Sequence, residues 1–143
     1  MKIVVGSDHG GFELKEKLKE WLVGEGHSVE DVGCSGERCD YPDFGAAVAR
    51  KVAGQTERIG IAVCGTGIGV CIAANKIKGV RAALVYDEFT AKMAREHNNA
   101  NVICLGGRTT EFGKAKEIVR VFLEAKFEGG RHEARIQKIA DLE

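Results

Sequence analysis

Five short apolar runs alternate with segments of helical periodicity along this chain, and this alternation restricts the fold more than any other feature. The runs predict strands at residues 2–6, 28–32, 59–64, 81–86 and 102–106. In the segments between them, apolar residues recur every three or four positions, as in amphipathic helices. Such alternation is typical of a parallel sheet covered on both faces. We predict an α/β fold: a three-layer, doubly wound, five-stranded parallel sheet, Rossmann-like, of order 2-1-3-4-5, with a C-terminal helix over about 131–142.

Length and composition exclude several classes of protein. The 143 residues predict one domain, residues 1–143, with a substantial core. Lys plus Arg equals Asp plus Glu at 21 each, which argues against a dedicated nucleic-acid binder and a polybasic membrane anchor. No apolar run is long enough to span a bilayer, and Asp8 comes too early for a signal peptide. The five cysteines are an odd number that fits reduced thiols, so we expect a cytoplasmic protein.

The predicted order places a ligand site at one point of the sheet. In a doubly wound sheet, ligands bind beyond the carboxyl ends of the strands, where the strand order reverses. Here that point lies between the first and third strands. The loops that leave these strands are Ser7 to Gly11 and Cys64 to Gly69, which carry more chemically active side chains than any others in the chain.

The second of these loops has glycine at every other position, Gly65, Gly67 and Gly69. It is not a P-loop, because no Lys-Ser/Thr pair follows it, and Val70 replaces the glycine that a dinucleotide fingerprint needs. A tight turn would also use glycines, but three alternating ones exceed that need. We therefore favour a loop whose backbone N–H groups, including that of Ile68, hold an anion or oxyanion.

Cys64 stands at the mouth of this loop, where a thiolate would be stabilised and the thiol pKa lowered. Buried cysteines are usually small apolar residues, and we expect Cys71 and Cys104 to be such residues. Cys34 and Cys39 could form a metal clip, although two thiols without a second pair are a weak metal signal.

Two histidines have both a structural and a functional interpretation. Asp8 and His9 in the first loop could cap a helix, or offer a carboxylate to a sugar hydroxyl and an imidazole to a phosphate. His97 could be a helix C-cap. The preceding helix, of about 10 residues or roughly 15 Å, carries the chain to the opposite edge of the sheet. His97 should therefore not reach Cys64 of its own chain, and it is either structural or part of a site completed by a neighbouring chain.

Three arginines are candidates for binding a phosphate. Arg131 and Arg135 are four residues apart and share a helical face, which is often only a solvated surface. Because Gly129-Gly130 allows close approach, they could instead clamp a phosphate. They also follow a helix that returns to the far edge, so the same argument for a neighbouring chain applies. Arg108, at the carboxyl end of the fifth strand, is the third candidate.

Several short motifs, in order over nearly the whole chain, resemble type B ribose-5-phosphate isomerase and the sugar-phosphate isomerase family that it shares with the galactose-6-phosphate isomerase subunits. The matching elements are Ser7-Asp8-His9, Asp40-Tyr41-Pro42, Cys64-Gly65-Thr66-Gly67-Ile68-Gly69, Ile72-Ala73-Ala74-Asn75-Lys76, His97-Asn98, Gly106-Gly107-Arg108 and Gly129-Gly130-Arg131-His132.

The resemblance implies an enzyme that interconverts ribose 5-phosphate and ribulose 5-phosphate through an enediolate, without a metal or other cofactor. It also implies a homodimer, or a dimer of dimers, with active sites shared between subunits. By resemblance, Cys64 is the base that moves a proton between C2 and C1, and His97 opens the furanose ring, with Asp8 helping to bind the ring hydroxyls. The resemblance also implies that Gly65 to Gly69, with the Thr66 hydroxyl, bind the enediolate oxygens. Asn98 would contact a sugar hydroxyl. The substrate and its phosphate would be held by His9, Arg108, Arg131 and Arg135.

Two details of the resemblance bear on the branch of the family. One branch uses a glutamate six residues after the cysteine position, where this chain has Val70, so the sequence resembles the branch that uses the cysteine. Galactose-6-phosphate isomerase subunits generally lack the His97-Asn98 pair, which favours a pentose phosphate. A hexose phosphate such as allose 6-phosphate or galactose 6-phosphate is the alternative, and a non-catalytic sugar-phosphate-binding or nucleotide-binding domain is a third.

Overall fold

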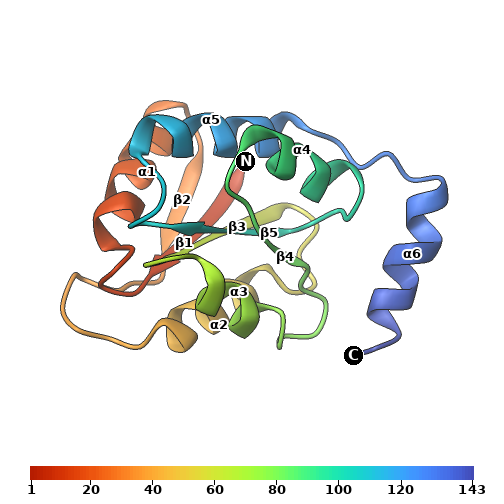
Figure 1. The fold of residues 1–143 in the computed structure, drawn as a ribbon, viewed down its shortest axis with the longest axis horizontal. Helices are drawn as coiled ribbons and strands as arrows, with labels where there is room; N and C mark the ends of the chain where they lie inside the picture. The colour runs from red at the N-terminus through yellow and green to blue at the C-terminus, as the bar shows by residue number, and fades with distance from the viewer.

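The computed structural model describes residues 1–143, and its five strands and six helices alternate as expected (Figure 1). The strands are β1 (Lys2–Ser7), β2 (Ser28–Asp31), β3 (Arg58–Cys64), β4 (Ala82–Leu84) and β5 (Val102–Gly106). The helices are α1 (Phe12–Gly24), α2 (Tyr41–Val52), α3 (Ile68–Ala74), α4 (Glu88–Glu96), α5 (Phe112–Glu124) and α6 (Arg131–Ala140). None of these helices combines the length and apolar composition needed to cross a bilayer.

The sheet is entirely parallel, as predicted, but its order is β2-β1-β3-β5-β4, so the predicted order 2-1-3-4-5 is wrong for the last two strands. β5 is the inner strand because all five of its residues are buried, with Ile103 packed toward one face and Cys104 toward the other. β4 has three residues and exposes Leu84, which suits an edge strand. The order still reverses between β1 and β3, where the site was predicted.

The two faces of the sheet are covered by different helices (Figure 1). α1, α4 and α5 cover one face, and their apolar residues pack with Ile3, Val5 and Ile103 in the larger core cluster. α2 and α3 cover the other face in a smaller cluster that includes Val4 and Cys64. This is the predicted three-layer architecture.

Three helix boundaries are informative. Asp87 caps α4, accepting the Thr90 N–H at 2.7 Å. α3 begins directly after Gly67, whose left-handed φ of 80° ends the glycine loop. α5 begins only at Phe112, because the Thr110 N–H closes a separate turn on the Gly106 carbonyl at 3.0 Å.

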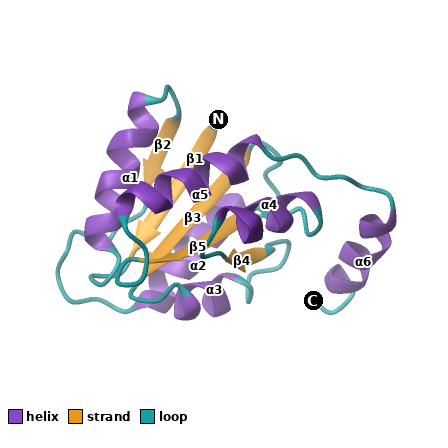
Figure 2. Cartoon of the chain, turned by 45° about the horizontal axis from the view of Figure 1, so that its top comes forward, coloured by secondary structure: helices purple, strands orange, loops and turns teal.

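α6 stands apart from the body of the molecule at the end of a long connection (Figures 1 and 2). His132 is its only buried residue. The end of the chain touches the body again where Glu143 Oε1 accepts the Gly79 N–H at 2.8 Å. A helix with so little buried surface gains little stability from its own chain.

Candidate active site

Three loops converge at the carboxyl ends of β1, β3 and β5. The Gly107 N–H donates to the Cys64 carbonyl at 2.7 Å, and the Arg108 N–H donates to the Gly65 carbonyl at 3.0 Å. A Cβ on Gly107 would lie 2.6 Å from the Gly10 carbonyl oxygen, so this approach of two backbones needs glycine. The structure thus brings together the predicted loops and adds that of Arg108.

Cys64 is the last residue of β3, and its thiol receives a backbone hydrogen bond. The Gly67 N–H donates to Cys64 Sγ at 3.2 Å, so the loop aims an amide at the sulfur. The side chain lies in the α2–α3 core cluster, and the residue is only 4% exposed. The sequence predicted a thiol at the mouth of the loop. In the single chain, the side chains of the α2–α3 core cluster leave Cys64 less exposed than this prediction implied.

The alternating glycines each have a steric explanation. A Cβ on Gly65 would approach the Arg108 guanidinium at 3.1 Å, and one on Gly69 would collide with the Tyr41 ring. Gly67 has a left-handed φ of 80°, which glycine adopts most readily. The glycine spacing alone therefore does not require a bound anion, and the support for anion binding at this loop rests on the Gly67 amide.

Asp8 and His9 occupy different positions in the β1 loop. Asp8 is buried, and its Oδ1 accepts the Gly11 N–H at 3.0 Å. His9 is exposed, and its Nδ1 lies 3.1 Å from the Cys39 carbonyl and 3.3 Å from the Cys39 N–H, with the ring tautomer deciding which bond forms. His9 and Arg108 line a cleft of about 510 Å³ together with Lys17, Glu13 and Glu111. Because Lys17 is paired with Glu13 at 2.8 Å, His9 and Arg108 are the groups of this cleft best suited to a phosphate.

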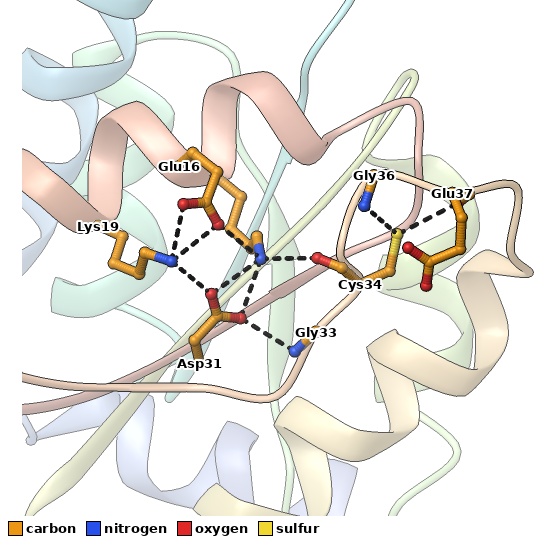
Figure 3. A network of polar contacts seen from close by, with 8 residues as sticks. Glu16, Lys19, Asp31, Gly33, Cys34, Gly36 and Glu37 are labelled. Carbon is orange, nitrogen blue, oxygen red and sulfur yellow. Dashed lines mark hydrogen bonds and ion pairs between the residues drawn. The ribbon is translucent and has the colours of Figure 1, made fainter.

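The loop from Cys34 to Cys39, which contacts His9, is anchored to α1 and β2 by an ion network around the buried Lys15. Lys15 Nζ donates to both carboxylate oxygens of Asp31 at 3.0 and 2.9 Å and to the Cys34 carbonyl at 3.0 Å. Figure 3 shows Asp31 also bound to Lys19 and to the Gly33 N–H. Burial alone would raise the pKa of Asp31, but the bonds from Lys19, Lys15 and Gly33 outweigh it and lower the pKa.

The Cys34–Cys39 loop does not have the features of a metal clip. Cys34 Sγ donates to the Glu37 carbonyl at 3.4 Å and accepts the Gly36 N–H at 3.3 Å, as Figure 3 shows. Burial, followed by the neighbouring Cys34, raises the pKa of Cys39 to about 11, and no third His, Cys, Asp or Glu side chain joins the two thiols in a group that could hold a metal ion. The loop instead positions His9.

Cys71 and Cys104 were expected to be plain apolar residues, and only Cys104 fits. Cys104 is fully buried, and the hydrogen bond with Cys71, together with burial, raises its pKa well above the ordinary value. Cys71 is half-buried, and the same bond lowers its pKa to about 7, assisted against burial by Leu84 and Asn75.

A second group of predicted residues gathers around His97, the C-cap of α4. Its ring stacks on His132 with centroids 4.2 Å apart and planes 15° apart. Glu128 Oε2 lies 3.9 Å from His97 Nε2 and 3.7 Å from His132 Nε2. Burial lowers the pKa of His132, and the neighbouring His97, Arg131 and Arg135 act in the same direction against Glu128.

The two groups lie at opposite ends of the strands. β3 and β5 pair Cys64 with Gly106 at their carboxyl ends and Gly60 with Val102 near their amino ends. The chain after His97 enters the sheet at this second level, where the Gly60 N–H donates to the Asn101 carbonyl at 2.8 Å. Four strand residues separate the levels by about 13 Å. This agrees with the expectation that His97 does not reach Cys64 of its own chain.

The remaining predicted residues divide between the same two groups. Thr66 is exposed at the first, where its Oγ1 accepts the Ile68 N–H at 3.4 Å. Asn98, Arg131 and Arg135 are exposed at the second. The sequence reasoning gave no role to Lys15, Glu128 or His132. The last two are four residues apart, a spacing that indicates neighbours on a helical turn, but the intervening glycine pair hides it.

Comparison with known proteins gives matches along nearly the whole chain. A family model described as Ribose/Galactose Isomerase matches residues 3–139. Ribose-5-phosphate isomerase B of Escherichia coli is 44% identical over 143 residues, which cover 99% of this chain and 96% of that protein. The structure of ribose-5-phosphate isomerase B from Mycoplasma genitalium with bound ribulose-5-phosphate is 48% identical with a TM-score of 0.94, covering 99% of this chain and 95% of that one. The galactose-6-phosphate isomerase subunit LacB of Clostridium acetobutylicum is 46% identical over 142 residues, covering 99% of this chain and 82% of that protein.

These similarities agree with the converging loops, the sheet and the C-terminal helix. The chain belongs to the Ribose/Galactose Isomerase family.

Proposed function

We propose that this protein interconverts ribose 5-phosphate and ribulose 5-phosphate, a step of the pentose phosphate pathway, in the cytoplasm. The observation that carries the proposal is the similarity, over 99% of this chain, to a structure described with bound ribulose-5-phosphate. The cleft beside His9 and Arg108 supports a phosphorylated substrate.

In this mechanism the Cys64 thiolate takes the proton from C2 of the open-chain aldose. The electron pair moves to the C1 carbonyl oxygen and forms an enediolate. The proton returns from sulfur to C1, while the O2 proton is passed to O1, so that C1 is reduced, C2 is oxidised and no external oxidant or cofactor is needed. The Gly67 N–H, which already points at the sulfur, stabilises the thiolate. Removing one comparable donor from an oxyanion site typically costs about 3 kcal/mol in the barrier.

The substrate is held by groups at both ends of the sugar phosphate. The loop from Gly65 to Gly69, with the Thr66 hydroxyl, binds the enediolate oxygens. Asp8 and Asn98 contact sugar hydroxyls, and His97 opens the furanose ring by proton transfer. His9, Arg108, Arg131 and Arg135 grip the phosphate, whose binding energy fixes C1 and C2 against the sulfur.

Because these residues lie at two levels about 13 Å apart, the proposal requires a homodimer, alone or paired into a dimer of dimers. Each site then combines Cys64 of one subunit with His97 of the other. Exposed apolar side chains support a subunit interface on α3, β4 and the start of α4. They are Ile68, Ile72, Leu84, Tyr86 and Phe89. The detached α6 is also placed to pack on a second chain.

A hexose phosphate isomerase is the second candidate, supported by the 46% identity to a galactose-6-phosphate isomerase subunit. The His97-Asn98 pair favours the pentose phosphate. The glutamate that serves as the base in one branch of the family corresponds to Val70 here. Val70 is fully buried and has no ionisable group, so it cannot replace Cys64 as a base. Turnover measured with ribose, allose and galactose phosphates distinguishes these substrates directly.

Substitution of the two central residues tests the mechanism. Cys64→Ala should nearly abolish turnover while retaining substrate binding, and Cys71→Ala, which removes a thiol outside the site, is the matched control. His97→Ala should impair turnover of cyclic ribose 5-phosphate far more than that of an open-chain substrate. Undiminished turnover by Cys64→Ala would eliminate the thiolate mechanism, and equal losses on both substrates would eliminate ring opening by His97.

A mixture of the two inactive chains tests the shared site. Cys64→Ala and His97→Ala subunits that exchange should form heterodimers with one intact site and regain part of the activity. A verified heterodimer without activity would argue that each chain carries its own complete site.

A further inference from the structure

The group around His97 has the composition and spacing of a metal site. His97, Glu128 and His132 each offer one ligand atom, and these three atoms lie within 4.8 Å of one another. Donors at about 2.1 Å from a tetrahedral Zn²⁺ are roughly 3.4 Å apart. The two nitrogen-to-carboxylate distances, 3.9 and 3.7 Å, exceed this spacing by only a few tenths of an ångström. The three residues come from the end of α4, the connection before α6 and the first turn of α6.

An independent observation points to a ligand at this place. His132 Nε2 is buried and has no hydrogen-bond partner, and the His132 side chain is only 6% exposed. Buried polar atoms without a partner are rare in folded proteins and call for an explanation such as an ion.

We infer that His97, Glu128 and His132 bind a divalent transition metal such as Zn²⁺ through two imidazole nitrogens and one carboxylate oxygen. This donor set leaves at least one coordination position open to water or another ligand. A metal lies in the plane of each imidazole that binds it, so the stacked rings must splay on binding. His97, whose side chain is 34% exposed, is the ring that is free to turn.

A metal bound here has a functional consequence that rests on the proposed isomerase activity. Coordination occupies the Nε2 lone pair of His97, so the imidazole can no longer move the proton that opens the furanose ring. Zn²⁺ should therefore inhibit turnover of cyclic ribose 5-phosphate more than turnover of an open-chain substrate. The metal acts as an inhibitor and supplies none of the isomerisation chemistry.

Binding is tested first, without reference to activity, by titrating the whole protein with equimolar Co²⁺ and displacing it with Zn²⁺. Visible d–d absorption without a sulfur charge-transfer band is expected for nitrogen and oxygen ligands. His132→Gln and Glu128→Gln should each weaken Zn²⁺ binding by more than the 10–100-fold typical of losing an outer-shell partner. Glu128 is half-exposed, so its substitution tests the site even if His132→Gln perturbs folding. Glu133→Gln removes an exposed carboxylate next to His132 and is the matched control.

Unchanged Zn²⁺ affinity in both variants, or a thiolate charge-transfer band at equimolar Co²⁺, would overturn the site. Inhibition is then measured with the wild-type protein and Glu128→Gln. If Zn²⁺ binds as described but turnover is equally sensitive in both proteins, the inhibitory role is wrong while the site stands. If no sugar phosphate is turned over at all, the proposed function fails and the binding result is unaffected.

Discussion

Replacing Lys15 with methionine should destabilise the protein measurably, because this lysine is almost fully buried and holds three parts of the fold together. Its side chain is 1% exposed, and Nζ binds two Asp31 oxygens and the Cys34 carbonyl within 3.0 Å. Breaking a fully buried ion pair costs about 3–5 kcal/mol. Asp31 is 23% exposed and keeps Lys19 at 2.8 Å, so we expect a smaller loss, about 2–3 kcal/mol.

Urea unfolding followed by circular dichroism measures this loss, with all proteins at one concentration because association would shift the midpoint. At about 2–4 °C per kcal/mol for a chain of this size, the melting temperature should fall by roughly 4–12 °C. Lys17→Met is the matched control on the same helix. Lys17 and its partner Glu13 are 50% and 84% exposed, so its loss should stay within about 0.5 kcal/mol.

A loss below about 1 kcal/mol for Lys15→Met would refute the reasoning. The network also predicts a pH dependence, because the pKa of Asp31 is lower in the folded protein than in the unfolded chain. The stabilisation is therefore complete above the ordinary carboxyl range and is lost as the pH falls through the folded pKa. Lys15→Met should flatten this acid dependence.

Two further predictions concern a thiol outside the site and the glycine loop. The Cys71 pKa of about 7 predicts that the rate of iodoacetamide labelling of this thiol reaches a plateau just above neutral pH. Cys104→Ala should shift this plateau to higher pH. A labelling rate that still rises toward pH 9 in the unmodified protein would contradict the lowered pKa. Gly67→Ala should cost at least about 1–3 kcal/mol in urea unfolding, because the φ of 80° disfavours alanine and a Cβ would lie 2.9 Å from the Leu105 backbone. Gly24→Ala, with open space around its Cβ, should be nearly neutral, and equal effects at both positions would argue against strain at Gly67.

The sequence predicted the elements better than their arrangement. Residues 102–106 were placed as a strand with the observed bounds, because a run apolar on both faces has few alternatives. The order of β4 and β5 was predicted wrongly. The physical reason for the observed order is that β4 has only three residues and is partly exposed, whereas all five residues of β5 are buried. The default order places consecutive strands side by side, and only the burial of each strand decides which one takes the edge.

The candidate site likewise has parts that the sequence could predict and parts that it could not. The loops of Asp8 and Cys64 could be placed together because parallel strands end at one edge. The separation of His97 followed from the length of one helix. The contacts of Cys39 with His9, and of Glu128 with His132, could not be predicted, since they depend on how irregular segments fold back on the body.

Under the proposed mechanism, the position of the catalytic candidates at two ends of one sheet makes the activity depend on the protein concentration. A lone polypeptide would carry a thiol without its acid–base imidazole, and an imidazole without its thiol. Dilution below the dissociation constant of the dimer should then abolish turnover while every chain stays folded. Newly synthesised chains would be inactive until they dimerise.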